Sequence, residues 1–538
     1  MTTIFISLIL LLALVAIRIS NKSGLPELLL FLGLGIFFSA KGMEFKDYAL
    51  ADQMASLSLM VIMFYGGFGT NWSMGKSVAQ ESIILSSLGV FFTALLTGAF
   101  CHFVLKMDFL ESMLLGSVVG STDYASVSNI LVSKNLNLKY NTASLLEIES
   151  GSNDPTAYTM TMVFLALLAG TELFVPLLIF KQVVFGLGLG FLMAWIFFKV
   201  IAIFHFEEDG LFSVFIAALM FGTYGLSNYL GGNGYLSIYV LGILMGDQEY
   251  VGKRDLVFFY DGVSSLVQIA LFFLLGLMSK PALIVKALPL GLAIMVFMLL
   301  VARPLTVFGL MAPFKLKENQ KALISFAGIR GAAAIAFAIM AINSKVPLDM
   351  DLFHIIFAIC LFSALIQGSL MPLVTKKLQM FDPNDTVLKT FNYYQDKSRL
   401  GFVQTRILDQ SPWVGQKIKD VKMVFNFIIA KIERNGETII PRGETKLKAG
   451  DLVVLGGETH FDKSGQNLLE ITLSPHHHWV GKKIQDLHLD KNELIIMLQA
   501  EDGEIIVPSG EILLKAGDRL VLIQTHDIKK ARDRGKSA

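Results

Sequence analysis

The sequence predicts an all-α polytopic membrane domain followed by two small α+β modules that lie in water. Hydrophobic residues make up 54% of the 538 residues, and the mean hydropathy is +0.61. Soluble domains of this size need far more polar surface, so most of the chain belongs in lipid. Charge is concentrated at the end: the last 163 residues, from Lys376 onward, hold 47 of the 89 Asp, Glu, Lys and Arg residues. Two solvents therefore imply two domains.

Composition also excludes several functional classes. A net charge of +1 gives no basic excess for nucleic acid, and the two cysteines lie in apolar runs and suggest neither a disulfide framework nor a thiolate metal cluster. Neither a Gly-x-Gly-x-x-Gly nor a Gly-Lys-Ser/Thr sequence opens a helix after a strand, so nucleotide hydrolysis has no visible site. His476–His478 lack companion ligands at metal-binding spacing and are expected to be solvated. The chain is therefore not expected to be an enzyme.

Thirteen apolar runs are long enough to cross about 30 Å of hydrocarbon. They centre near residues 3–20, 25–40, 54–70, 81–104, 108–133, 143–169, 177–204, 211–229, 231–246, 258–279, 283–311, 320–343 and 352–375. An odd number places the termini on opposite sides. Ten basic residues fall in the loops on one side and five on the other, so the positive-inside rule predicts an outside N-terminus and a cytoplasmic tail.

The tail contains an internal repeat with a period of about 67 residues. Gly436–Asp451 matches Gly503–Asp518 with eleven of sixteen residues identical. Each copy predicts a short helix, a β-branched strand, a turn with glycine, a second strand ending at proline and a last strand after Ala-Gly-Asp. The predicted domains are 1–375 (transmembrane), 376–399 (linker), 400–470 (first module) and 471–538 (second module with a basic tail).

Ionisable residues at bilayer depth are costly, so each one is a functional candidate. The candidates are Glu111, Asp123, Glu147, Glu149, Asp154, Lys181, Lys199, Asp261, Lys286, Arg303 and Arg330. Glu111, Asp261 and Arg303 are also compatible with span ends, and the three lysines can reach the membrane interface.

The richest cluster of polar residues runs from Glu147 to Pro155. On a helix, Ser150 and Asp154 share one face and offer a hydroxyl and a carboxylate to a hard cation, while Glu149 and Asn153 share the adjacent face. Pro155 removes a helical hydrogen bond and frees backbone oxygen nearby. Packing alone needs fewer polar groups, so transport is the favoured interpretation over a buried structural network.

Two further stretches, 116–125 and 327–334, place charges between glycines inside apolar runs. This pattern is typical of discontinuous transmembrane helices, whose broken ends present dipoles and carbonyls near the midplane. Arg330 is then placed to neutralise either Glu149 or the end dipole of the broken fifth span. Close helix packing explains either glycine cluster alone, but the pair points to a transporter site.

Several motifs together resemble a known family. Gly120-Ser-Thr-Asp123, the 147–155 stretch, Val301-Ala-Arg-Pro304 and Gly328-Ile-Arg-Gly331 resemble NhaP-type monovalent cation/proton antiporters, closest to the potassium/proton, or cell volume regulation, branch. The resemblance covers roughly residues 1–376. It implies a thirteen-span homodimer with a scaffold domain and a mobile six-helix core in which two discontinuous helices cross.

The resemblance also implies roles for individual residues. Asp154 would be the shared carrier of cation and proton, and the cation site would comprise Asp154, Ser150, Thr122 (through its backbone) and Asp123. The residues that brace the site would be Glu149, Asn153 and Arg330. No metal is implied beyond the transported cation. Many relatives carry an acid where this chain has Tyr65, so either a ligand is missing or Tyr65 lends a neutral hydroxyl to the site wall. Either case weakens the local negative field and favours potassium over sodium.

The two tail modules resemble tandem RCK C-terminal (TrkA-C) domains over about 130 residues, through Trp-Val-Gly-x-Lys-Ile, Pro-x-Gly-Glu and Leu-Lys-Ala-Gly-Asp. That resemblance implies dimerisation and a small anionic regulatory ligand, such as cyclic di-AMP or another nucleotide. No other cofactor is implied.

The leading hypothesis is a secondary active antiporter of the bacterial plasma membrane that exchanges potassium or sodium for protons under control of its cytoplasmic tail. Two alternatives remain: an RCK-gated cation channel and a membrane-anchored ligand sensor. A channel would need a carbonyl filter sequence, and a sensor has no need of Asp154 in hydrocarbon.

Overall fold

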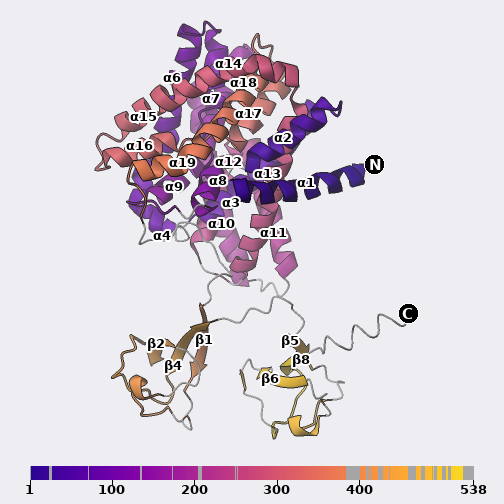
Figure 1. Ribbon diagram of the computed structural model, residues 1–538, viewed down its shortest axis with the longest axis vertical. Helices are drawn as coiled ribbons and strands as arrows, with labels where there is room; N and C mark the ends of the chain where they lie inside the picture. The colour runs from indigo at the N-terminus through magenta and orange to yellow at the C-terminus, as the bar shows by residue number, and fades with distance from the viewer. Residues whose placement is uncertain are drawn as a thin grey trace. The chain divides into compact units, whose positions relative to one another are not determined.

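The computed structural model describes residues 2–382 and 400–524, apart from gaps at 24–26, 71, 134–135, 173, 204–208, 249, 251, 408–410, 412, 422–427, 435–436, 459–467, 474–478, 488, 490–492, 500–504 and 507–509. The chain divides into two compact units, 1–394 and 395–538. The first unit is helical and the second contains the strands (Figure 1). The predicted linker from residue 383 onward, the His476–His478 loop and the basic end from residue 525 lie outside the described residues.

The predicted fold class is confirmed, because every predicted span coincides with helix. Eight spans are single helices: α1 (Thr2–Ser23), α2 (Glu27–Ala40), α3 (Tyr48–Gly69), α9 (Thr142–Leu168), α10 (Val175–Ile203), α11 (Asp209–Tyr229), α12 (Gly234–Asp247) and α13 (Lys253–Met278). A ninth span consists of three segments that continue into one another: α5 (Ala79–Ile84), η2 (Leu85–Gly89) and α6 (Val90–Phe103). The short α4 (Trp72–Gly75) and η1 (Lys76–Val78) precede that ninth span.

Near the end of the unit, two further spans run without interruption. One combines α14 (Pro281–Phe297), η3 (Met298–Ala302) and α15 (Arg303–Leu310), and the other combines α18 (Leu352–Phe362), η4 (Ser363–Gly368) and α19 (Ser369–Lys377). In the described part of the chain, seven helices are long and apolar enough to cross a membrane, and shorter apolar helices accompany them. The chain is thus a multi-pass membrane protein.

The fifth and twelfth spans are interrupted, as their glycines predict. The fifth divides into α7 (Phe109–Val118) and α8 (Tyr124–Ser133), and the twelfth into α16 (Glu318–Phe326) and α17 (Ala332–Asn343). The two breaks meet, because the Asp123 backbone N–H donates to the Ile329 carbonyl at 2.8 Å. Irregular backbone is tolerated at this depth only where protein or a water-filled cavity surrounds it.

Glycines bring several helix pairs into backbone contact, among them α2–α13 and α3–α12. A Cβ built on Gly35 of α2 would stand 2.2 Å from the Phe273 carbonyl oxygen of α13, and one on Gly276 would stand 2.4 Å from the Leu32 carbonyl oxygen. In the same way, a Cβ on Gly246 of α12 would stand 2.2 Å from the Phe68 carbonyl oxygen of α3. Helices in lipid associate through such close packing, so these glycine seams join α2 to α13 and α3 to α12.

The second unit contains two antiparallel four-stranded sheets with the same topology. The first has the order β1-β4-β2-β3 and the second β5-β8-β6-β7, and their strands are drawn in Figure 1. The first sheet comprises β1 (Leu400–Arg406), β2 (Ile428–Arg434), β3 (Glu437–Ile439) and β4 (Leu452–Glu458). The second comprises β5 (Leu468–Thr472), β6 (Glu493–Gln499), β7 (Ile505–Ile506) and β8 (Arg519–Gln524). One 3₁₀ turn in each, η6 (Ile418–Asp420) and η7 (Ile484–Asp486), stands where the sequence predicts a short helix.

The structure differs from the prediction in three details of the second unit and its boundaries. The sequence analysis did not predict the first strand of each sheet, β1 or β5. Because β5 pairs with β8 from Leu468 onward, the second module begins before residue 471. The linker cannot begin at residue 376 either, since α19 continues to Lys377 and the backbone N–H of Asp382 donates to the Asn137 carbonyl at 2.9 Å.

The first module contains an ion pair, between half-buried Arg434 and buried Asp451, whose arginine the sequence repeat does not duplicate. Arg434 Nε donates to Asp451 Oδ1 at 2.7 Å, and its Nη2 donates to Oδ2 at 2.8 Å. These bonds from Arg434 lower the pKa of the Asp451 carboxyl group below its ordinary value. With the 67-residue period, Glu501 stands in the sequence where the first module has Arg434. The two copies therefore differ in charge at this position.

Candidate functional site

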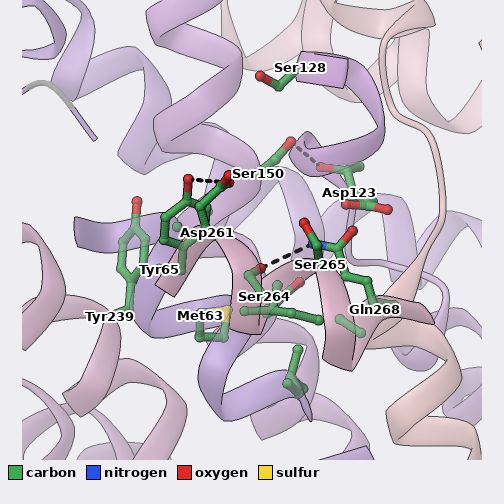
Figure 2. A pocket seen from close by; sticks show the side chains of 18 of the residues that line it. Met63, Tyr65, Asp123, Ser128, Ser150, Tyr239, Asp261, Ser264, Ser265 and Gln268 are labelled. Carbon is green, nitrogen blue, oxygen red and sulfur yellow. Dashed lines mark hydrogen bonds between the residues drawn. The ribbon is translucent and has the colours of Figure 1, made fainter. Parts of the chain in front are cut away.

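A cavity of about 380 Å³ lies inside the helical unit beside the meeting point of the two broken spans. Its lining includes Asp123 at the first break, Ser150 of α9, Tyr65 of α3 and Asp261 of α13 (Figure 2). Asp154 of α9 also lines it. The structure thus brings several of the predicted site residues to one partly open cavity, in which 7% of the Asp154 surface is exposed.

Asp154 lies against the break in the fifth span. Its Oδ1 accepts a short hydrogen bond from Ser121 Oγ, and Ser121 is itself buried. Ser150, one helical turn earlier, exchanges a hydrogen bond of 2.8 Å between its Oγ and Thr122 Oγ1. Carboxylate and hydroxyl oxygens therefore converge at this point, and such oxygens are the ligands that alkali and other hard cations prefer.

Asn153 fixes the broken segment to α9. Its side-chain amide donates to Thr122 Oγ1 at 2.5 Å, and the residue is fully buried. This contact agrees with the bracing role expected of Asn153. The resemblance gave Thr122 a role only through its backbone. The structure shows that its side-chain hydroxyl also contacts Asn153 and Ser150.

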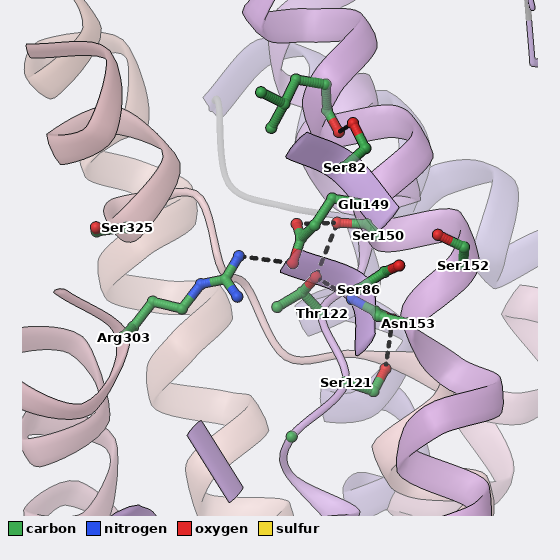
Figure 3. Close-up of polar contacts among 12 residues, drawn as sticks. Ser82, Ser86, Ser121, Thr122, Glu149, Ser150, Ser152, Asn153, Arg303 and Ser325 are labelled. Atoms are coloured by element: carbon green, nitrogen blue, oxygen red, sulfur yellow. Dashed lines mark hydrogen bonds and ion pairs between the residues drawn. The ribbon is translucent and has the colours of Figure 1, made fainter. Parts of the chain in front are cut away.

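The expected ion pair between Glu149 and Arg330 is absent from the described residues, and Glu149 has a different partner. Arg303 Nη2 donates to Glu149 Oε1 at 2.8 Å, and the two side chains are 2% and 1% exposed (Figure 3). Ser150 Oγ also donates to Glu149 Oε2 at 3.3 Å. Arg303 is therefore a buried side chain paired with Glu149.

Arg330 has the second of its two predicted roles. Its Nη1 donates to the carbonyl oxygens of Gly120 and Ser121 at 2.7 and 2.6 Å, just beyond the C-terminal end of α7. Its backbone N–H donates to Ser363 Oγ at 2.9 Å. A cation at this position neutralises the negative end of the broken helix and satisfies two backbone acceptors.

Asp123 lies close to the other break. Its Oδ2 accepts from Ser126 Oγ at 2.6 Å, and a Cβ built on Gly331 would stand 2.0 Å from the same oxygen. Position 331 therefore admits no side chain while Asp123 occupies its place. Gly331 of the 327–334 stretch therefore has a steric reason that the sequence alone does not reveal.

Tyr65 lies on the cavity wall, as predicted, and its hydroxyl donates to Asp261 Oδ1 at 2.7 Å (Figure 2). Asp261 is thus a cavity residue, which sequence reasoning missed by allowing it a span-end position. The available signal was its spacing, because Asp261, Ser264, Ser265 and Gln268 follow the period of one helix face. For Arg303, the signal was its position between apolar segments of one long span.

Glu111 has a structural environment. Its carboxylate accepts from the backbone N–H groups of Asp349 and Met350 at 2.6 and 3.2 Å. These contacts tie the start of α7 to the segment before α18. Nothing in this arrangement connects Glu111 with the cavity.

Two family descriptions match the chain. The family described as "Sodium/hydrogen exchanger, transmembrane" matches residues 8–377, and the TrkA-C domain matches residues 402–460 and 468–534. The first match covers all the site residues described above.

Curated relatives extend over most of the chain. The protein named K(+)/H(+) antiporter NhaP2 of Shewanella baltica (strain OS223) is 32% identical over 457 residues, which cover 82% of this chain and 78% of that protein. The K(+)/H(+) antiporter NhaP of Alkalimonas amylolytica is 28% identical over 468 residues, which cover 85% and 81%. The Na(+)/H(+) antiporter NhaH of Halobacillus aidingensis is 27% identical over 322 residues, which cover 55% and 75%.

The fold is also similar to a solved structure. The sodium proton antiporter MjNhaP1 from Methanocaldococcus jannaschii at pH 8 superposes with a TM-score of 0.61 at 23% identity, covering 70% of this chain and 97% of that one. At this identity, the similarity supports the architecture of the helical unit.

Proposed function

Because the chain belongs to the sodium/hydrogen exchanger family, we propose a specific mechanism for its activity as a cation/proton antiporter: Asp154 carries cation and proton in turn. The protein is a secondary transporter and not an enzyme. The observation that carries the proposal is the position of Asp154, which lines the cavity and accepts a hydrogen bond from Ser121 at the break of the fifth span.

The exchange follows from the chemistry of one carboxylate. Ionised, Asp154 binds a dehydrated cation together with Ser150, Thr122 and Asp123; protonated, it has no charge to hold the cation. Cation and proton therefore compete for one group. Glu149, Asn153 and Arg330 hold the two broken segments in register around it, and Arg303 compensates the buried charge of Glu149.

Potassium is our first choice of cation, with sodium as a second substrate. Tyr65 places a neutral hydroxyl on the cavity wall in place of an acid, which lowers the negative field and disfavours the more charge-dense ion. The names of the relatives from Shewanella baltica and Alkalimonas amylolytica specify K(+)/H(+) antiport, which agrees with this choice.

We also propose the setting in which the exchanger works. The loop charges favour a bacterial plasma membrane protein with its N-terminus outside and its tail in the cytoplasm, acting as a homodimer. The proposed domains are the exchange domain, a linker and two TrkA-C modules that bind a small anionic regulator, with cyclic di-AMP as the first candidate.

Everted membrane vesicles test the transport proposal. Potassium or sodium is added to vesicles with an acid interior, and a pH-sensitive dye reports proton release. We expect exchange with both ions and a lower half-saturating concentration for potassium. Cation flux uncoupled from protons would instead indicate a channel, and no flux at all would indicate a sensor.

Asp154→Asn tests the assignment of the carrier. The amide has nearly the same shape but carries no charge, so exchange should fall to background in both directions while the detergent melting temperature stays near that of the wild type. Asp255→Asn, an exposed position in the first turn of α13, is the matched control and should leave exchange unchanged. Substantial exchange by Asp154→Asn would refute the assignment.

A further inference from the structure

We propose that the cavity contains a second cation station, formed by Tyr65, Asp261, Ser264, Ser265 and Gln268, which we call the vestibule cluster. It takes the same class of ligand as Asp154, a monovalent cation, but in a partly hydrated state on the way to or from the carrier. This inference rests on the proposed function and extends it to a residue group on different helices.

Four of the five residues form a polar stripe on α13. Positions 261, 264, 265 and 268 recur at helical spacing and all line the cavity (Figure 2). Large apolar side chains occupy other positions of the same stretch, where Phe258, Phe259 and Leu266 are 44%, 48% and 52% exposed. A transmembrane helix with one polar stripe directs that stripe toward protein or water, so the stripe forms a hydrophilic side of the cavity.

The cluster supplies the oxygen atoms that an alkali cation needs. Asp261 provides a carboxylate, and Tyr65, Ser264 and Ser265 provide hydroxyls. The Tyr65 hydroxyl holds Asp261 Oδ1 at 2.7 Å, and the Gln268 amide donates to Ser264 Oγ at 3.2 Å. These contacts orient the side chains without supplying a positive charge. Asp261 has no ion pair in the described part of the chain, so its charge remains available to a mobile cation.

The charges that line the cavity also favour binding of a cation. Its lining contains the carboxyl groups of Asp123, Glu147, Asp154 and Asp261, and the described lining includes no Lys, Arg or His. A cleft with one sign of charge and low-dielectric walls concentrates counter-ions. A volume of about 380 Å³ has room for on the order of ten water molecules, enough for a cation that keeps part of its hydration shell.

The contrast in burial gives the two carboxylates different tasks. Asp154 is 7% exposed and held by Ser121, whereas Asp261 is an exposed residue of α13. A buried carboxylate compensates the free energy lost when the ion is dehydrated only by coordinating the ion directly. An exposed carboxylate attracts an ion that keeps its water, so little dehydration free energy is lost. Asp261 therefore raises the occupancy of the cavity, and Asp154 performs the exchange.

The competing interpretation is that Tyr65 and Asp261 merely clamp α3 to α13, and two variants separate the interpretations. Asp261→Asn removes the charge but keeps an oxygen that can accept from Tyr65. Tyr65→Phe removes the hydrogen bond and keeps the charge. A cation station depends mainly on the charge, whereas a clamp depends on the hydrogen bond.

The experiment measures potassium/proton exchange by the full-length protein in proteoliposomes, together with its melting temperature. For Asp261→Asn we expect the KM for potassium to rise roughly three- to tenfold at low ionic strength, with the maximal rate within about twofold of wild type. Added choline chloride should raise the wild-type KM and reduce this difference, because salt screens the charge. Asp261→Glu should return the KM toward the wild-type value, and Asp255→Asn on the same helix should not change it.

The inference is overturned if wild type exchanges cations but Asp261→Asn has the wild-type KM. It is equally overturned if Tyr65→Phe lowers the melting temperature and raises the KM as much as Asp261→Asn, which is the result a clamp gives. Should the Asn variant not fold, Asp261→Ser is measured in its place with the same expectation. A wild-type protein without any exchange would refute the proposed function itself, and is thereby distinguished from failure of the station.

Discussion

At the scale of single residues, Arg303 is a charged side chain buried in the helical unit, with 2% of its surface exposed. Only one of its guanidinium nitrogens, Nη2, has a hydrogen-bond partner among the described residues, the Glu149 carboxylate; Nε and Nη1 have none. Beside it lies a small polar void of about 10 Å³ lined by Ser325, Arg330 and Gln367 among others, which is close to the space of one water molecule.

We expect Arg303→Ala to destabilise the protein strongly, because it leaves Glu149 as a buried charge without its partner. By analogy with soluble proteins, the loss is about 3–5 kcal/mol. Glu149→Gln added to Arg303→Ala should restore part of that loss, as measured by melting temperature in detergent. Lys286→Ala, an exposed basic residue on the same span, is the control and should be close to neutral. Additive losses in the double variant would contradict the pairing.

At the scale of elements, the glycine seam between α2 and α13 predicts that adding a side chain at the contact lowers stability. Gly35→Ala places a methyl group 2.2 Å from a backbone oxygen, so the helices must separate, at a cost of about 1–3 kcal/mol. Gly33→Ala in the same helix meets nothing within 4 Å and is the matched control. Melting temperatures in detergent should fall for Gly35→Ala and stay level or rise for Gly33→Ala. Equal effects of both substitutions would show that the seam does not set the packing.

The sequence predicted elements better than it predicted partners. Every span was found because a run of apolar residues of bilayer length has few other solutions, and glycines beside charges identified both breaks. Strands β1 and β5 were missed because they lie outside the most similar stretch of the repeat, and β1 follows a charged linker. The sequence offered Arg330 either Glu149 or the end dipole of the fifth span, and it did not connect Glu149 with Arg303, because both arginines are far from Glu149 in the sequence and spacing cannot rank two distant partners.

At the scale of the whole molecule, the tail is separable from the transport site. The described residues that line the cavity or contact the site all lie within residues 17–367, and the second unit is compact by itself. A ligand of the tail changes transport only if it binds one state of the membrane unit's cycle more tightly than another.

We therefore expect a chain that ends at Asp382 to exchange potassium for protons without responding to cyclic di-AMP, while the full chain responds. The end point follows from the pairing of Lys139 and Asn137 with residues 380–382, which a cut at 376 would remove. Vesicle exchange with and without the nucleotide measures the difference. A full chain indifferent to cyclic di-AMP would exclude this nucleotide as the regulator.

The glycine seams also determine which parts of the molecule are stiff. At Gly35 and Gly276, where two backbones touch, a slide along the axis is opposed because it would carry toward the contact the residues three or four positions away on the same helix face, which all bear side chains. We therefore expect the pairs α2–α13 and α3–α12 to form a stiff frame. We expect the backbone to move more easily at 119–123 and 327–331, where it leaves the helix and is held by hydrogen bonds from a few side chains. We therefore expect an arriving ion to displace those two short segments first, while the frame stays in place.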